Sequence, residues 1–124
     1  MNQRKLKNMP EFRLIDEKFS EVHREKQWVY SCLFNLTIND KEIAKITITD
    51  HTWRKKGREK ITKELILNVL KRLNGRKVKP TNYPKRRVFK RERIDYQDKK
   101  YKIVFWFENN DPNWIWVRVC HQQD

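Results

Sequence analysis

The apolar residues of this 124-residue chain are concentrated in short runs, and the spacing within those runs changes along the sequence. Hydrophobic and charged side chains each make up 37% of the chain, a balance that on its own can indicate disorder. Because the apolar residues cluster instead of scattering, the sequence predicts one folded domain over 1–124 with a thin core. Fifteen aromatic residues supply large side chains for that core. Residues 1–9 are polar and basic, so we expect them to be disordered.

The first apolar runs predict a helix followed by a hairpin over residues 10–49. Pro10 suits the first turn of a helix. From Glu11 to Lys26 the apolar residues recur mostly at helical spacing, with charged residues between them. The period then becomes two over 28–38 and again over 44–48, which predicts two strands with a turn at Asn39-Asp40.

The second half of the chain predicts one more helix and three strands. The apolar stripe from Ile61 to Leu73 is typical of an amphipathic helix, and Gly75 is a suitable stop signal. Alternating residues then predict strands over 86–95, 100–108 and 114–121. The order of elements predicts an α+β fold, with a mostly antiparallel sheet of about four to five strands and two helices packed on one face.

Cys32 and Cys120 lie far apart and show no CxxC spacing, so we expect both to be reduced strand residues, with a disulfide as the alternative. No apolar run approaches the length of a transmembrane helix, and no apolar signal segment follows the basic start. The sequence therefore predicts a cytoplasmic protein that does not engage a membrane. It makes no prediction about the oligomeric state.

All of the surplus charge lies in one segment. Between His51 and Arg93 there are seventeen Lys or Arg residues and three acids, which accounts for the whole net charge of +14. Clustered cations favour a polyanionic partner, and closely spaced phosphates reward them through counterion release. RNA is the partner that we expect. An acidic protein is the weaker alternative, because phosphate binding explains clustered arginines more directly.

The last strands also predict a sheet with two different faces. Aliphatic residues alternate with Trp114, Trp116, Arg118 and Cys120, which we expect to face the opposite way. Guanidinium groups can hold phosphates while indoles stack on unpaired bases, which favours RNA over duplex DNA. The alternative is that the tryptophans pack beneath the N-terminal helix and the arginines are solvated. The predicted RNA-binding residues are Arg54, Lys56, Lys60, Lys85, Arg86, Arg87, Lys90, Arg91, Arg93, Trp116 and Arg118.

His51 lies where an apolar strand meets a basic loop. A neutral imidazole there can take a proton from a ribose 2′-hydroxyl, while Lys55 and Arg58 stabilise the phosphate in the transition state. His121 could supply the second proton-transfer group. This set predicts RNA cleavage with no cofactor and no metal, since no metal-binding motif or phosphate-cradling glycine loop occurs. The alternative is that His51 is a surface histidine and His121 a terminal residue with no role.

A family resemblance covers 45–122. A strand ends in His51 (Ile46-Thr47-Ile48-Thr49-Asp50-His51), a basic loop leads to a helix, and basic antiparallel strands end in Trp116-Val117-Arg118-Val119. This order resembles the RNase toxins of the barnase, EndoU, colicin and RelE-like fold, especially the small colicin D-like domains. The resemblance implies an RNase core over 50–122 that cuts RNA without metal. It also implies a catalytic role for His51, phosphate binding by Lys55, Lys56 and Arg58, and an acidic antitoxin or immunity protein as a partner.

The hairpin over 28–49 is not part of that family pattern. Two hypotheses about function follow from the sequence. The first is a toxin-like, metal-independent RNA endonuclease that cleaves by transesterification. The alternative is a basic nucleic-acid-binding module without catalytic activity.

Overall fold

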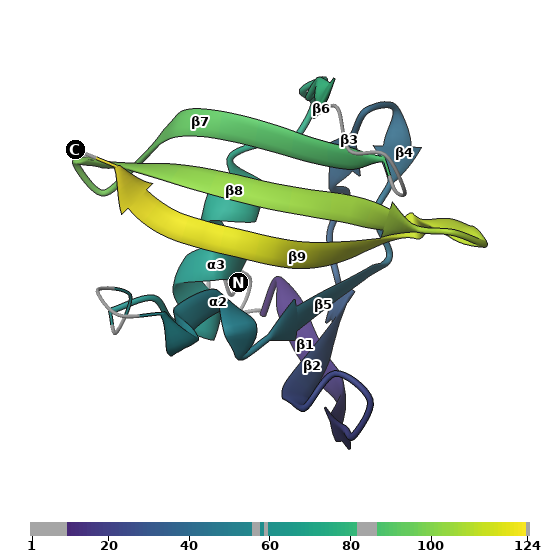
Figure 1. The fold of residues 1–124 in the computed structure, drawn as a ribbon. Coiled ribbons are helices and arrows are strands. Elements are labelled where there is room, and N and C mark those ends of the chain that lie inside the picture. The colour runs from purple at the N-terminus through teal and green to yellow at the C-terminus, as the bar shows by residue number, and fades with distance from the viewer. Residues whose placement is uncertain (1–9, 56–57, 59, 82–86, 124) are drawn as a thin grey trace, which may run out of the picture.

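Seven strands form one mixed sheet in the computed structural model, which describes residues 10–55, 58, 60–81 and 87–123 (Figure 1). The spatial order is β1-β2-β5-β9-β8-β7-β6, and only β5 and β9 pair in parallel. The α+β class and the mostly antiparallel sheet are confirmed. In chain order the strands of this sheet are β1 (Phe12–Ser20), β2 (Glu25–Cys32), β5 (Lys45–Thr49), β6 (Pro80–Thr81), β7 (Val88–Tyr96), β8 (Lys99–Glu108) and β9 (Asp111–Gln123).

Two short helices and a small separate hairpin complete the described elements. The helices are α2 (His51–Arg54) and α3 (Lys63–Lys71), and the hairpin pairs β3 (Thr37–Ile38) with β4 (Lys41–Glu42). The predicted second helix and the predicted turn at Asn39-Asp40 are confirmed. The two turn residues have φ values of 55° and 63°, as a tight hairpin turn requires.

The predicted N-terminal helix over 11–26 is wrong. These residues instead form β1, a turn and the start of β2, and the two strands pair antiparallel. The side chains that suggested a buried helical stripe lie on an edge strand, where Leu14, Ile15 and Phe19 are 45%, 48% and 59% exposed. An amphipathic helix would need to bury these side chains, whereas β1 is held by backbone pairing with β2 and leaves them exposed. The sheet therefore has seven strands instead of the predicted four to five.

Two smaller expectations also change. The predicted strand over 28–38 begins earlier, at Glu25, and ends at Cys32. It still pairs with the strand that precedes His51, since Trp28 lies opposite Ile48. The basic loop after His51 begins with α2, one turn of helix.

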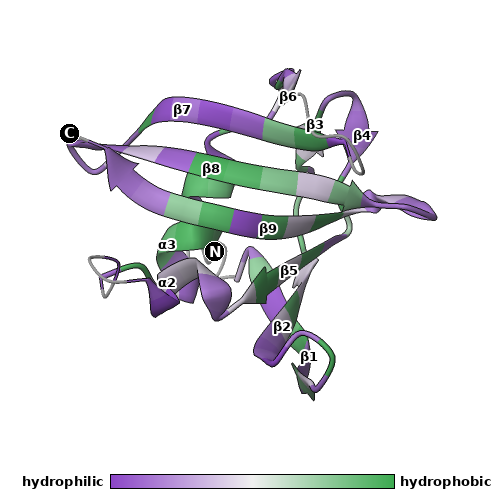
Figure 2. Ribbon diagram, in the orientation of Figure 1, coloured by the Kyte–Doolittle hydropathy of each residue, from purple (hydrophilic) through white to green (hydrophobic). Residues whose placement is uncertain are grey.

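The core lies between α3 and one face of the sheet, which we call the inner face. In the view of Figure 1, α3 lies behind β8 and β9, and Figure 2 colours much of its ribbon as hydrophobic. The Thr62 side chain caps α3 by accepting a hydrogen bond of 3.1 Å from the Leu65 N–H. Gly75 follows the helix with a φ of 79°, a conformation that favours glycine. The buried contacts join Ile66, Val69, Leu70 and Leu73 to Ile46, Ile48, Ile103, Phe105, Ile115 and Val117.

A β-bulge in β9 corrects the predicted position of Cys120. Val104 pairs with Val119 and Phe105 with Val117, so Arg118 is an extra residue in the ladder. The bulge turns Cys120 to the inner face, where it is fully buried, and not to the face of Trp116. Both cysteines are free thiols, as expected. None of the described helices is long and apolar enough to cross a membrane.

The buried core and the exposed edge strand β1 predict different costs for the same substitution. Phe105→Ala removes a fully buried ring and should lower the free energy of unfolding by about 3–5 kcal/mol. Phe19→Ala is the matched control, since its ring is mostly exposed, and should change that free energy by roughly 0.5 kcal/mol or less. Urea unfolding followed by tryptophan fluorescence measures both, and equal losses would contradict this assignment of the core.

The two thiols should differ in reactivity. Burial raises the pKa of Cys120 to about 12, although the charge of Arg58 acts the other way. Burial also raises the pKa of Cys32, which remains partly exposed. At about pH 8 a maleimide should therefore label Cys32 slowly and leave Cys120 unmodified until urea unfolds the protein. Mass spectrometry of the labelled peptides measures both rates. Labelling of Cys120 in the folded protein as fast as Cys32 would contradict the prediction.

Candidate nucleic-acid interface

Three stacked tryptophans occupy the outer face, the side of the sheet opposite α3. The rings of Trp106 and Trp116 lie 6.2 Å apart at an interplanar angle of 8°, and those of Trp114 and Trp116 lie 6.3 Å apart at 27°. We call these three residues the tryptophan ladder. They cannot pack beneath an N-terminal helix, because residues 12–20 form the edge strand β1. All three are partly exposed to solvent.

Cations and a hydrogen bond hold the ladder at its ends. The guanidinium carbon of Arg118 lies 5.9 Å from the ring centre of Trp106, and Lys45 Nζ lies 4.7 Å from that of Trp114. The Trp114 indole Nε1–H donates to Thr47 Oγ1 at 2.8 Å, which fixes this ring against β5. The bulge places Arg118 here, so a local irregularity brings a guanidinium group to the aromatic surface.

The outer face continues from the ladder across β5 and β2. Trp116 pairs with Thr47, and Thr47 pairs with Val29 on the next strand. Because side chains alternate along a strand, Glu25 and Gln27 lie on the same face as Val29. Glu25 is four residues away from Val29, or about 13 Å at a rise of about 3.3 Å per residue. One face therefore runs from the ladder to the beginning of β2.

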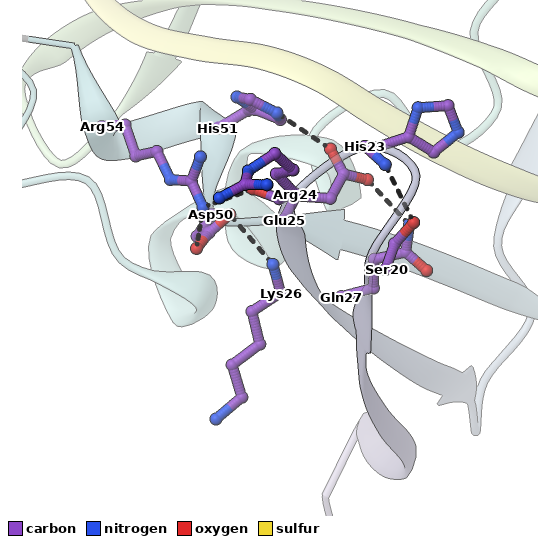
Figure 3. A network of polar contacts seen from close by, with 9 residues as sticks. All are labelled: Ser20, His23, Arg24, Glu25, Lys26, Gln27, Asp50, His51 and Arg54. Atoms are coloured by element: carbon purple, nitrogen blue, oxygen red, sulfur yellow. Dashed lines mark hydrogen bonds and ion pairs between the residues drawn. The ribbon is translucent and has the colours of Figure 1, made fainter.

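His51 meets Glu25 at that end of the face (Figure 3). His51 Nε2 lies 3.2 Å from Glu25 Oε1, and Gln27 Nε2 donates to Glu25 Oε2 at 2.7 Å. The side chain of His51 is 50% exposed, whereas that of Glu25 is 10% exposed. A carboxylate offers no proton, so in the neutral ring this contact favours the proton on Nε2 and leaves Nδ1 as the acceptor nitrogen.

A second carboxylate, Asp50, fixes α2 to the turn between β1 and β2. Asp50 Oδ1 accepts from the Lys26 backbone N–H at 3.1 Å, and Asp50 Oδ2 accepts from Arg54 at 2.9 Å. The same Arg54 Nη2 donates to the Arg24 carbonyl at 2.9 Å. Arg54, which was predicted to bind RNA, is therefore engaged in contacts within the protein (Figure 3).

The other predicted residues near His51 keep their charges available. Lys55 and Lys60 are exposed and Arg58 is partly exposed. Within the described part of the chain, these three side chains form no ion pair. The predicted residues Lys56, Lys85 and Arg86 lie outside the described residues.

The cations of β7 are divided between the two sides of the sheet. Lys90 pairs with Val104 and therefore lies on the outer face, 3.8 Å from Glu92. Arg91 pairs with Ile103 on the inner side, and Arg87 lies over the inner ring of Phe89 at 5.8 Å. Arg93 lies at a second bulge, where its N–H donates to Gln123 at 2.7 Å. The structure thus brings only part of the predicted basic strand to the ladder.

His121 lies on the outer face opposite Lys102, and its Nδ1 is 3.1 Å from the Gln122 carbonyl. In the residues that the structure describes, no hydrogen bond or ion pair joins His121 to His51. No three His, Cys, Asp or Glu side chains of those residues gather as a group that could hold a metal ion.

No family model, curated protein or solved structure matches this chain. The resemblance to RNase toxins therefore remains a prediction.

Sequence reasoning missed Glu25 and Gln27 because it placed Glu25 within a helix. One signal in the sequence could have found them. Glu25, Gln27 and Val29 alternate with Trp28 and Tyr30, and that alternation is typical of a strand whose two faces differ. An earlier start for this strand would have placed Glu25 beside the end of the strand that leads to His51.

Proposed function

We propose that this protein binds single-stranded RNA on the outer face of its sheet. The observation that carries the proposal is the tryptophan ladder with Arg118 at one end and Lys45 at the other. Indole faces stack on unpaired bases, and neighbouring cations pair with the phosphates between those bases. A duplex hides the faces of its bases, so the ladder favours a single strand.

The charge of the protein supports the same proposal at longer range. The net charge of +14 attracts any polyanion, and this attraction does not depend on sequence. The ladder adds a contact that only an accessible base can make. Lys90, Lys102 and Arg118 lie on the same face and can hold the backbone beside it.

Binding should depend on the stacking surface. Trp116→Leu should weaken binding of a fluorescent single-stranded RNA by about 1–3 kcal/mol, or roughly 5- to 150-fold, while Trp116→Phe should lose less because it keeps a flat ring. Fluorescence anisotropy measures the affinity, and a duplex of the same sequence should compete poorly. Thermal melting confirms that each variant is folded. Wild-type affinity in a folded Trp116→Leu variant would contradict the proposal.

The affinity for RNA should also fall as the salt concentration rises. The slope of log affinity against log salt is proportional to the number of phosphate contacts. Arg118→Gln should reduce the slope of log affinity against log salt by about 1. Arg76→Gln is the matched control, since Arg76 is an exposed arginine that follows α3 on the other side of the sheet. The same anisotropy titrations at several salt concentrations measure the slopes. Equal slopes for both variants would contradict a role of Arg118 in phosphate binding.

Metal-independent cleavage of the bound RNA at His51 is the second candidate function. The contact between His51 and Glu25 favours it, because a half-exposed imidazole held by a carboxylate can act as a general base. The imidazole would take the proton of a ribose 2′-hydroxyl, while Lys55 and Arg58 stabilise charge on the phosphate.

The cleavage proposal predicts that the protein cuts single-stranded RNA in the presence of EDTA. His51→Ala should lower the rate by roughly 10²- to 10⁴-fold. His23→Ala is the matched control and should keep the wild-type rate, because His23 lies exposed in the turn before β2. Denaturing gels of end-labelled RNA measure the rates. The proposal would be contradicted by a wild-type protein that cuts no faster than His51→Ala, or by complete loss of cleavage in EDTA.

A further inference from the structure

We infer that Glu25 is a positioning residue that fixes the tautomer of His51, so that Nδ1 is the ring nitrogen that takes a proton. The inference rests on the second candidate function, cleavage of RNA at His51. To the cleavage proposal it adds a residue that acts on His51, the ring nitrogen that carries the proton, and the ring nitrogen that receives the proton of the 2′-hydroxyl. All three follow from contacts on the outer face.

The first support is the geometry of the carboxylate. Glu25 Oε1 lies 3.2 Å from His51 Nε2, and Glu25 Oε2 accepts from Gln27 at 2.7 Å. Each oxygen therefore has its own partner, and the carboxylate is held in one orientation. Since a carboxylate offers no proton, its 3.2 Å contact with Nε2 favours the proton on that nitrogen in the neutral ring.

The second support is the burial of Glu25. A charged group removed from water is costly unless it is paired and hydrogen-bonded. In the described part of the chain, its side-chain partners are Gln27 and His51, and neither is a permanent cation. The buried carboxylate therefore depends on its contact with His51 Nε2, and this contact favours the tautomer with the proton on Nε2.

The third support is the contrast with Asp50, the carboxylate adjacent to His51 in the sequence. Asp50 is occupied by Arg54 and by the backbone N–H of Lys26. The Asp50 N–H in turn donates to the Lys26 carbonyl at 3.1 Å. These bonds join the start of α2 to β2, so they hold His51 beside Glu25 without competing for its ring (Figure 3).

The arrangement assigns each proton in the cleavage step. The 2′-hydroxyl proton moves to His51 Nδ1 while the 2′-oxygen forms a bond to phosphorus. The bond from phosphorus to the 5′-oxygen breaks, and that oxygen takes a proton from a separate acid, either His121 or water. The products are a 2′,3′-cyclic phosphate and a 5′-hydroxyl. His51 is then a cation beside Glu25, which stabilises it as the carboxylate of a catalytic triad does.

The first test is the tautomer itself in the free protein. Nitrogen-15 NMR of the neutral His51 ring should show the proton on Nε2 in the wild type, with exposed His23 as the internal reference. Glu25→Gln should shift His51 toward a mixture of tautomers, because an amide can donate as well as accept. Glu25→Asp should retain more of the Nε2–H form. A proton on Nδ1 in the wild type would overturn the inference without any variant, as would an unchanged tautomer in folded Glu25→Gln.

The second test is kinetic and uses the same variants. Glu25→Gln should lower kcat for cleavage on the order of 10²-fold with little change in KM, because Glu25 acts through His51 and not on RNA binding. Glu25→Asp should recover part of the loss. An unchanged kcat in folded Glu25→Gln would overturn the positioning role. A wild-type protein that does not cleave would refute the cleavage proposal alone, since the NMR measurement needs no RNA.

Discussion

The parallel pairing of β5 with β9 holds the two halves of this protein in one sheet. The N-terminal strands β1, β2 and β5 and the C-terminal strands β7, β8 and β9 are otherwise antiparallel units. On the inner face the pairing aligns Ile46 with Ile115 and Ile48 with Val117, and all four side chains are buried. On the outer face it aligns Thr47 with Trp116. The same backbone contact therefore completes the core and joins the ladder to β2, which carries Glu25, and to β5, which leads to His51.

The outer face contains features that stability alone does not explain. Among the residues that the structure describes, five polar or charged ones are buried, and four of these lie on β2 and β5 of this face: Glu25, Gln27, Thr47 and Thr49. Burying such groups is costly unless hydrogen bonds compensate. The Trp116 Nε1–H is also buried, with no acceptor among the described residues. A phenylalanine there would avoid an unpaired donor that costs about 1–3 kcal/mol, so folding stability does not account for the tryptophan at this position.

The sequence predicted the elements that are buried on one side and missed those that are not. Strands β7, β8 and β9 and helix α3 pack against one core, so their apolar residues follow the expected periods. Local conformation was also predictable at Gly75 and Asn39-Asp40. The prediction failed for β1 because an exposed edge strand has no buried face, so its apolar residues need not recur with a period of two. The bulge at Arg118 depends on the register with β8, a relation between two strands that neither segment shows by itself.

The proposed function assigns attraction and recognition to different residues. The charges of the basic segment do not form one surface, since Lys90 and Arg91 lie on opposite sides of the sheet and Arg54 is paired with Asp50. Such a distribution spreads positive potential over both sides of the sheet, and salt screens it. In the proposed function, stacking on indoles and proton transfer at His51 act only at contact and are much less sensitive to salt. In the proposed function, charge therefore accounts for the encounter with RNA. The proposal assigns the position and strandedness of a bound RNA to a few residues of the outer face, most of them outside the basic segment.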